Sequence, residues 1–243
     1  MIKAIIFDQD GTLIQTEILK ATSYGDAIAK LSKNTIDRQE VIDNYERCIG
    51  VSREDVLNNL VDNFGESLIK TTGINDTAAL KAKILKKRLG IYKAMLEDAR
   101  LLQEHFCIHT LDFLKKSKLE GYRIVLATMS HWAEVEQIIK AIGIYDAFDF
   151  ILTREDVQHG KPQPDIYMLA QKKLGLRPHE CLVVEDSLNG VKAALAAGLK
   201  VFAVTNIFTH NAVVSAGVLP PDFIIENPAD IDKRIGDFIV ENR

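Results

Sequence analysis

The sequence predicts an α/β protein in which a doubly wound parallel sheet carries a small all-helical domain, inserted after the first strand. Two features of the chain lead to this prediction. From about residue 109 onward, short strands rich in β-branched residues alternate with helical segments, which is typical of parallel sheets. Between Thr12 and that point, about ninety residues show helical periodicity and no convincing strand.

The first strand ends at Phe7, and the inserted block that follows it is rich in Leu, Lys, Glu and Asn. Helices are expected in this block at residues 17–32, 38–48, 53–64 and 77–103. Ser52 and Asp55 have the spacing of a capping box, which predicts that the third of these helices begins directly after Ser52.

The alternating part of the chain completes the sheet. Helices are expected at residues 109–119, 132–141, 164–175, 188–196 and 229–241, and strands at residues 123–128, 148–152, 181–184, 201–204 and 222–225. We therefore expect an α/β core domain, residues 1–15 and 106–243, and a helical cap domain, residues 16–105. Because the insert begins right after a strand-end turn, we expect it to close over that turn as a lid.

Composition limits the classes of partner. The 243 residues are 47% hydrophobic and 26% charged, as in ordinary soluble globular proteins. The net charge of −4, with acids and bases interspersed, argues against a nucleic acid polymer or a membrane as partner. The three cysteines form no C-x-x-C pair. The sequence contains no run of about 20 apolar residues, and we expect no signal sequence. We expect a cytoplasmic protein, a monomer or weak dimer, that acts on a small molecule.

Two carboxylates follow the first strand directly. Asp8 and Asp10 are two residues apart, so in an extended segment both side chains face the same small volume, and Gly11 permits a sharp turn after them. Ligands of open α/β sheets bind at this carboxyl edge. Like charges so close together require a cation, although an acidic N-cap after a core strand is the plainer alternative.

Three later segments add polar groups near the same edge. Thr128 ends the second core strand, and its hydroxyl can donate to a phosphoryl oxygen. Lys161, in G-K-P-Q-P, offers an ammonium that offsets repulsion between an anionic nucleophile and a phosphate. Glu185 and Asp186 end another apolar strand and carry the carboxylate oxygens that Mg²⁺ prefers. Taken singly, these residues also fit a local backbone contact, an exposed loop lysine and a helix N-cap.

Together these segments resemble the four motifs of the haloacid dehalogenase (HAD) superfamily, in the same order: D-x-D-G-T, a strand ending in Thr, G-K-P-x-P and E-D-S-x-x-G. The whole chain is similar to HAD phosphatases with a type 1 helical cap. The resemblance implies a Rossmann-like core with Asp8 as nucleophile and Asp10 as general acid and base. It also implies that Thr128, Lys161 and the amides of the turn at residues 9–11 stabilise the phosphoryl group.

The same resemblance implies a Mg²⁺ site. The ligands would be the Asp8 carboxylate, the backbone carbonyl of Asp10 and the Asp186 carboxylate. Glu185 would support the site from beside Lys161 or the metal.

The helical insert gives a partial indication of the substrate. Arg53 lies in G-V-S-R-E-D, which resembles a cap segment of β-phosphoglucomutases and related sugar-phosphate phosphatases; in the mutases the matching arginine binds a distal phosphate. A solvated residue of the first helical turn is the alternative for Arg53. Thr16 and Ser130 also match positions that line the mutase pocket. Lys20 and the pair His131-Trp132 depart from the mutase pattern.

The predicted function is therefore a Mg²⁺-dependent phosphatase that hydrolyses a small phosphomonoester, in the first place a sugar or polyol phosphate, through an aspartyl-phosphate. Phosphoglycolate and nucleoside monophosphates are further candidate substrates. The resemblance disfavours dehalogenases and phosphonoacetaldehyde hydrolases, because they lack an Asp at the position of Asp10. A β-phosphoglucomutase-like isomerase and a non-catalytic HAD-derived binding protein are the alternatives.

Overall fold

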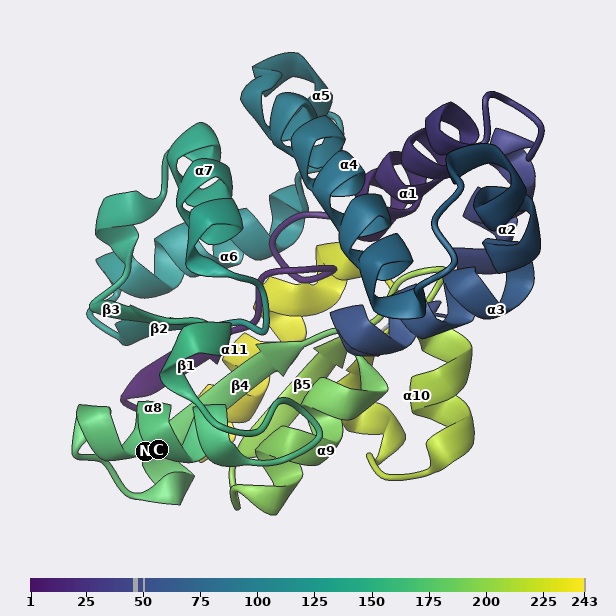
Figure 1. Cartoon of the computed structure of the whole chain (residues 1–243). Coiled ribbons are helices and arrows are strands. Elements are labelled where there is room, and N and C mark those ends of the chain that lie inside the picture. Colours follow the sequence, from purple (N-terminus) through teal and green to yellow (C-terminus); the bar gives the residue numbers. More distant parts are fainter. Residues whose placement is uncertain (46–47, 50, 243) are drawn as a thin grey trace. The chain divides into compact units, whose positions relative to one another are not determined.

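The chain forms two compact units. The computed structural model describes residues 1–45, 48–49 and 51–242 (Figure 1). One unit contains residues 1–15 and 102–243, and the other contains residues 16–101. The first is an α/β unit, and the second is helical.

The α/β unit contains a six-stranded sheet in which every pair of neighbouring strands is parallel, in the order β3-β2-β1-β4-β5-β6. The strands are β1 (Ala4–Phe7), β2 (Arg123–Ala127), β3 (Phe150–Leu152), β4 (Cys181–Glu185), β5 (Lys200–Val204) and β6 (Ile224–Ile225). The order reverses at β1, because the chain goes first to one side of this strand and then to the other. This arrangement confirms the predicted doubly wound fold and makes the ends of β1 and β4 a topological switch point, where such sheets bind ligands.

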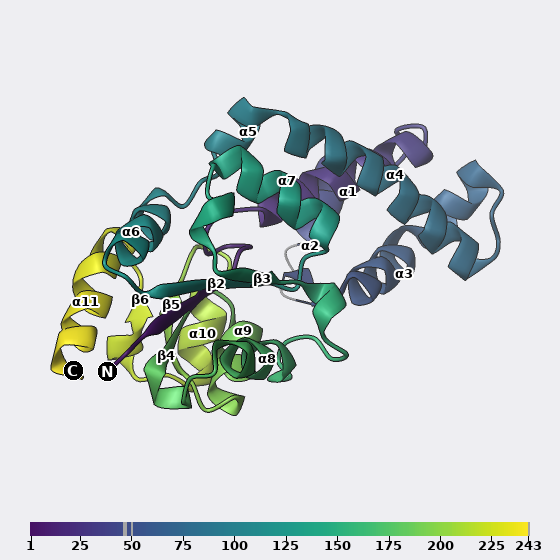
Figure 2. The same ribbon diagram turned by 90° about the vertical axis from the view of Figure 1, so that its left-hand side faces the viewer.

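Helices cover both faces of the sheet (Figure 2). Alternate strand residues point to opposite faces, so Ile5 and Phe7 pack with α6 (Ile108–Leu119), α7 (Trp132–Ile142) and α11 (Ile231–Glu241). Ala4 and Ile6 pack on the other face, with α8 (Asp165–Leu174), α9 (Leu188–Ala196) and α10 (His210–Ala216). A sheet that is buried on both faces explains the near-continuous apolar runs of its strands.

The helical unit has its own apolar core. Its main helices are α1 (Glu17–Leu31), α2 (Arg38–Tyr45), α3 (Arg53–Thr72) and α4 (Thr77–Glu97), and α5 (Ala99–Gln103) follows at the boundary. Buried side chains such as Ile28, Leu60, Leu68 and Ile84 pack together in this unit. Among the residues that the structure describes, no helix is both long and apolar enough to cross a bilayer.

Several elements differ from the predictions. The helix predicted at 53–64 continues through Gly65 to Thr72, because Leu68, in its second half, is buried in the apolar core. The predicted helix 77–103 is interrupted at Asp98, whose ψ of 97° is extended rather than helical. Helix α10 was not predicted at all. Of the predicted helix 38–48, α2 covers Arg38–Tyr45, and residues 46 and 47 lie outside the described residues.

The segments that leave and re-enter the α/β unit run side by side. Ile14 forms an antiparallel bridge with Phe106, and the Gln15 amide donates to the carbonyl of His105 at 2.8 Å. The Cys107 amide donates to the Leu13 carbonyl at 3.0 Å. These contacts fix the turn that follows β1 against the start of α6.

Candidate active site

The turn after β1 presents two carboxylates at the edge of the sheet. The Asp8 amide donates to the Val184 carbonyl at 3.0 Å and so continues the β1–β4 pairing. The Gln9 carbonyl closes the turn by accepting from the amides of residues 12, 13 and 14. Gly11 has a φ of 84°, and a Cβ atom there would lie 2.1 Å from Oδ2 of Asp186. A glycine is therefore required both by the backbone conformation and by the close approach of the Asp186 carboxylate.

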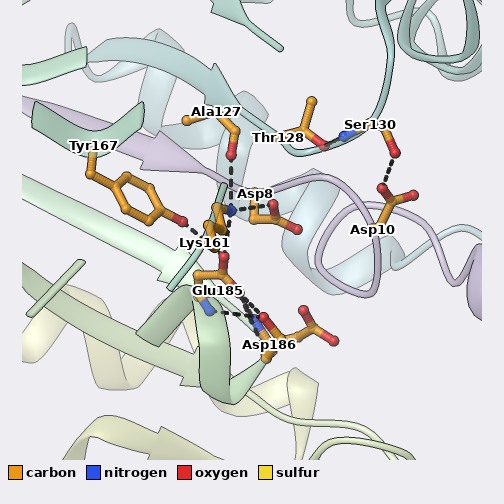
Figure 3. A network of polar contacts seen from close by, with 11 residues as sticks. Asp8, Asp10, Ala127, Thr128, Ser130, Lys161, Tyr167, Glu185 and Asp186 are labelled. Carbon is orange, nitrogen blue, oxygen red and sulfur yellow. Dashed lines mark hydrogen bonds and ion pairs between the residues drawn. The ribbon is translucent and has the colours of Figure 1, made fainter. Parts of the chain in front are cut away.

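Lys161 joins the ends of three strands (Figure 3). Its Nζ atom lies 2.6 Å from Asp8 Oδ1, 2.6 Å from Glu185 Oε1 and 3.1 Å from the carbonyl oxygen of Ala127. The side chains of Lys161, Asp8 and Glu185 are 6%, 9% and 0% exposed. These contacts bring the lysine of the G-K-P-Q-P segment to the two carboxylates.

The Glu185 carboxylate is held on both oxygens. Oε1 accepts from Lys161 and, at 2.8 Å, from the hydroxyl of Tyr167. Oε2 accepts from the amides of Asp186 and Ser187 and from the Ser187 hydroxyl, at 2.9–3.0 Å. A Cβ atom at Gly190 would lie 1.8 Å from Glu185 Oε1, so only glycine lets α9 approach this carboxylate.

The charges of this cluster do not balance. Burial lowers the pKa of Lys161, but the Asp8 and Glu185 carboxylates raise it well above its usual value, so the ammonium stays charged. Burial raises the pKa of Glu185, but the contact with Lys161 outweighs it and keeps this carboxylate ionised. Burial raises the pKa of Asp8 from 3.8 to about 8, although Lys161 opposes the rise. One lysine thus neutralises only one of the two carboxylates, so the ionisation of Asp8 leaves a surplus negative charge.

A divalent cation would remove this surplus. Ligand oxygens of Asp8, Glu185 and Asp186 all lie within 4.8 Å of one another, and all three residues are buried. Mg²⁺ prefers carboxylate oxygens and takes few ligands from the protein, so the donor set fits this ion. Both Glu185 oxygens already accept hydrogen bonds, so Glu185 is poorly suited to direct contact with a metal.

Asp10, Thr128 and Ser130 form a second group beside Asp8 (Figure 3). The Ser130 hydroxyl donates to Asp10 Oδ2, which links the loop after β2 to the turn after β1. The Thr128 hydroxyl accepts from the Ser130 amide at 3.1 Å, an arrangement that leaves its own proton for another acceptor. The amide of Gly11 donates to the Ile14 carbonyl at 2.8 Å, so this member of the turn at residues 9–11 is engaged within the chain rather than directed at a phosphate.

Two residues of the site were not predicted from the sequence. Tyr167 lies on α8, with its ring 4.8 Å from Lys161 Nζ and its hydroxyl on Glu185. Asn206 lies just beyond the end of β5 and donates from Nδ2 to Asp186 Oδ2 at 3.0 Å. A polar residue directly after an apolar strand was the available signal for Asn206, whereas Tyr167 looks like any helical core residue.

The remaining predicted residues belong to the helical unit. Ser52 is the N-cap of α3, with its hydroxyl accepting from the Asp55 amide at 3.2 Å, so the predicted helix start is confirmed. Arg53 is the first residue of this helix, and Thr16 precedes α1. Gly50 of the G-V-S-R-E-D segment lies outside the described residues. The contacts of Arg53 and Thr16 with a substrate stay predictions.

The chain is similar to several known proteins. The family model for haloacid dehalogenase-like hydrolases matches residues 2–198. The pyrophosphatase PpaX of Bacillus velezensis is 32% identical over 235 residues, which are 95% of this chain and 94% of that protein. A phosphorylated carbohydrates phosphatase of Thermotoga maritima is 26% identical, over 89% of this chain and 92% of its own length.

A solved structure is similar over the same extent. A mutant of CbbY from Rhodobacter sphaeroides, in complex with xylulose-(1,5)bisphosphate, has a TM-score of 0.72 and 26% identity, over 95% of this chain and 96% of CbbY. The motifs, the doubly wound sheet and the match of the family model over residues 2–198 show that the chain belongs to the haloacid dehalogenase-like hydrolases.

Proposed function

We propose that this protein is a Mg²⁺-dependent phosphatase that hydrolyses a small phosphomonoester, a sugar or polyol phosphate, through an aspartyl-phosphate on Asp8. The family and the names of its relatives indicate a HAD-type phosphoric monoester hydrolase. The observation that carries the proposal is the buried cluster in which Lys161 contacts Asp8 and Glu185 at 2.6 Å while a third carboxylate, Asp186, lies alongside. A mere binding protein would have no need of this costly set of buried charges.

The first half of the reaction transfers the phosphoryl group to Asp8. A carboxylate oxygen of Asp8 attacks the phosphorus atom, and the bond between phosphorus and the ester oxygen breaks. Asp10, in its protonated form, gives its proton to the departing oxygen. Lys161 and the Thr128 hydroxyl stabilise the phosphoryl oxygens, and bound Mg²⁺ supplies further positive charge there.

The second half restores the protein. Asp10 accepts a proton from a water molecule, the water oxygen attacks phosphorus, and the bond to Asp8 breaks to release inorganic phosphate. The Ser130 hydroxyl holds the Asp10 carboxylate in place for both proton transfers. One carboxylate therefore acts first as an acid and then as a base.

Sugar phosphates are favoured as substrates by two relatives. One is named a phosphorylated carbohydrates phosphatase, and the CbbY structure holds a sugar bisphosphate. The mutase alternative is weakened at His131 and Trp132, which replace the mutase pair Lys-Asn. Glu155 contacts both residues, accepting from the Trp132 amide at 3.2 Å and lying 2.6 Å from His131 Nδ1.

A substrate screen tests this function. The purified chain is incubated with a panel of sugar, polyol, nucleoside and acid phosphates, and released phosphate is measured with Mg²⁺ or with EDTA. We expect hydrolysis of sugar or polyol phosphates that stops in EDTA. Undiminished hydrolysis in EDTA would refute the metal requirement, and hydrolysis restricted to another phosphate class would refute the substrate assignment.

A further inference from the structure

Asn206 has no counterpart among the motif residues, yet it contacts a proposed metal ligand. Its Nδ2 atom donates to Asp186 Oδ2 at 3.0 Å. Asp186 is 3% exposed, so this hydrogen bond is made where water has little access. The contact joins the end of β5 to the end of β4, which are neighbours in the sheet.

The orientation of the Asn206 side chain is fixed by its own loop. Its Oδ1 atom accepts from the Phe208 amide at 2.9 Å, which leaves Nδ2 as the end that faces Asp186. The Asn206 amide donates to the Thr209 hydroxyl at 3.1 Å, and the Asn206 carbonyl accepts from the amide of His210 at 3.0 Å. The side chain is therefore a preorganised donor rather than a mobile one.

A second contact restricts the same carboxylate oxygen. A Cβ atom built on Gly11 would lie 2.1 Å from Asp186 Oδ2, so this oxygen packs directly against the Gly11 backbone. Asp186 Oδ2 thus accepts from a fixed donor and is crowded by the turn after β1. A carboxylate held in this way is poorly placed to turn both oxygens toward one cation.

We propose that Asn206 is a positioning residue that restricts Asp186 to coordination through one oxygen and thereby makes the site select Mg²⁺ over Ca²⁺. Ca²⁺ takes six to eight oxygen ligands and readily binds carboxylates through both oxygens, whereas Mg²⁺ demands a compact octahedral shell. Groups that orient a metal ligand typically change metal affinity by about 10- to 100-fold when they are removed. This inference rests on the proposed function, because it assumes that Asp186 is a metal ligand.

The test measures cation binding without any substrate. The whole chain is melted in a calorimeter over a series of MgCl2 or CaCl2 concentrations, and Kd for each ion follows from the concentration dependence of the stabilisation. The variants are Asn206→Ala, which removes the donor, and Asn206→Asp, which keeps an oxygen for the Phe208 amide. Asn227→Ala is the matched control. Like Asn206, Asn227 accepts from the amide two residues later in the chain, in this case that of Ala229 at 3.2 Å, and it lies in the segment before α11.

We expect Asn206→Ala to weaken Mg²⁺ binding about 10- to 100-fold and Ca²⁺ binding much less, so that the ratio of the Ca²⁺ to the Mg²⁺ Kd falls. Asn206→Asp should lower the same ratio, because it adds an oxygen that Ca²⁺ can accommodate. Asn227→Ala should leave both constants unchanged. If the native chain binds Mg²⁺ but the ratio of the Ca²⁺ Kd to the Mg²⁺ Kd is unchanged in Asn206→Ala, the proposed role of Asn206 is wrong, while the metal site itself stands. A native chain that no Mg²⁺ concentration stabilises would instead overturn the metal site of the proposed function.

Discussion

At the scale of single residues, Asp8 and Asp10 differ in what surrounds them. Asp8 contacts Lys161 at 2.6 Å in a buried position, whereas Asp10 accepts a hydrogen bond from the Ser130 hydroxyl. A carboxylate beside a fixed ammonium is suited to attack an anionic phosphate, because the ammonium offsets the repulsion. A carboxylate oriented by a hydroxyl is suited to move protons. The difference in partners supports the proposed division of roles.

Replacing Asp10 tests its role in proton transfer. We expect Asp10→Asn to lower kcat by about 10²- to 10⁴-fold, because an amide can neither protonate the leaving oxygen nor accept a proton from water. The measurement is phosphate release from the best substrate of the screen. Circular dichroism of the variant checks that the fold is retained. A kcat within a few-fold of the native value would contradict the assignment of Asp10 as the general acid and base.

The raised pKa of Asp8 predicts a dependence of stability on pH. In the folded chain, burial raises this pKa to about 8, and the usual value of 3.8 applies to the unfolded chain. Between these values the folded state holds a proton that the unfolded state has lost, so the contribution of Asp8 to stability falls as pH rises through that window. Without metal, Asp8→Asn should therefore gain stability relative to the native chain as pH rises from about 4 to about 8.

Urea unfolding of both proteins in EDTA, over this pH range, measures the difference. We expect the advantage of Asp8→Asn to grow up to about pH 8 and then to level off. If the difference in the free energy of unfolding between the two proteins is the same at every pH, Asp8 ionises normally in the folded chain.

At the scale of elements, α9 is placed against the site by one glycine. In the interior of an exposed helix, replacing Gly by Ala stabilises by about 0.5–1 kcal/mol. Gly190 should show the opposite effect, because its Cβ atom would lie 1.8 Å from Glu185 Oε1. We expect Gly190→Ala to destabilise by about 1–3 kcal/mol and to lower kcat, since the displaced Glu185 no longer holds Lys161.

Gly236 provides the matched control. It lies inside α11, and a Cβ atom there would meet no atom within 4 Å. Gly236→Ala should stabilise by about 0.5–1 kcal/mol and leave kcat unchanged. Urea unfolding and phosphate release measure both quantities. If Gly190→Ala and Gly236→Ala shifted stability in the same direction, the close packing of α9 on Glu185 would be wrong.

Local patterns predicted most of the elements but not all of their limits. Apolar runs with β-branched residues identified the six strands, and Ser52 marked the start of α3. The continuation of α3 past Gly65 depends on the burial of Leu68 in the helical unit, a tertiary contact that outweighs the cost of a helical glycine. Helix α10 is only seven residues long, too short for its periodicity to stand out from a loop.

The structure brings together the candidate residues that follow strand ends. Asp8, Lys161, Glu185 and Asp186 come together because their segments all reach one edge of a parallel sheet. The contact of Asn206 with Asp186 depends on β5 lying next to β4, and periodicity alone does not give strand order. Motifs therefore predicted the charged residues, while Tyr167 and Asn206, which contact them, were found only from the fold.

At the scale of the whole molecule, the helical unit carries the predicted determinants of specificity. A HAD core supplies the same phosphoryl chemistry to many substrates, so differences between relatives must arise elsewhere in the chain. Arg53, at the start of α3, is the predicted ligand of an acidic or phosphorylated group on the substrate. The closure of the helical unit over the strand-end turn stays a prediction.

Replacing Arg53 tests this role. We expect Arg53→Ala to raise KM for substrates with a second acidic or phosphate group more than it lowers kcat, as expected when uniform binding is lost. Lys86→Ala, which removes a positive charge from an exposed position of the same unit, is the control and should change neither parameter. Equal KM values for native and Arg53→Ala proteins, across charged and uncharged sugar phosphates, would mean that Arg53 is a solvated residue.

The central claim is that Asp8 becomes phosphorylated and that water then completes the reaction. The most direct measurement mixes the chain with Mg²⁺ and β-glucose 1-phosphate or the best substrate of the screen, quenches with acid, and locates the phosphoryl group by mass spectrometry. Inorganic phosphate and glucose 6-phosphate are measured in parallel. We predict a phosphoryl group on Asp8, none in Asp8→Asn, and release of inorganic phosphate without a bisphosphate activator. Turnover with no phosphoryl group on Asp8, or formation of glucose 6-phosphate much faster than any hydrolysis, would contradict the account.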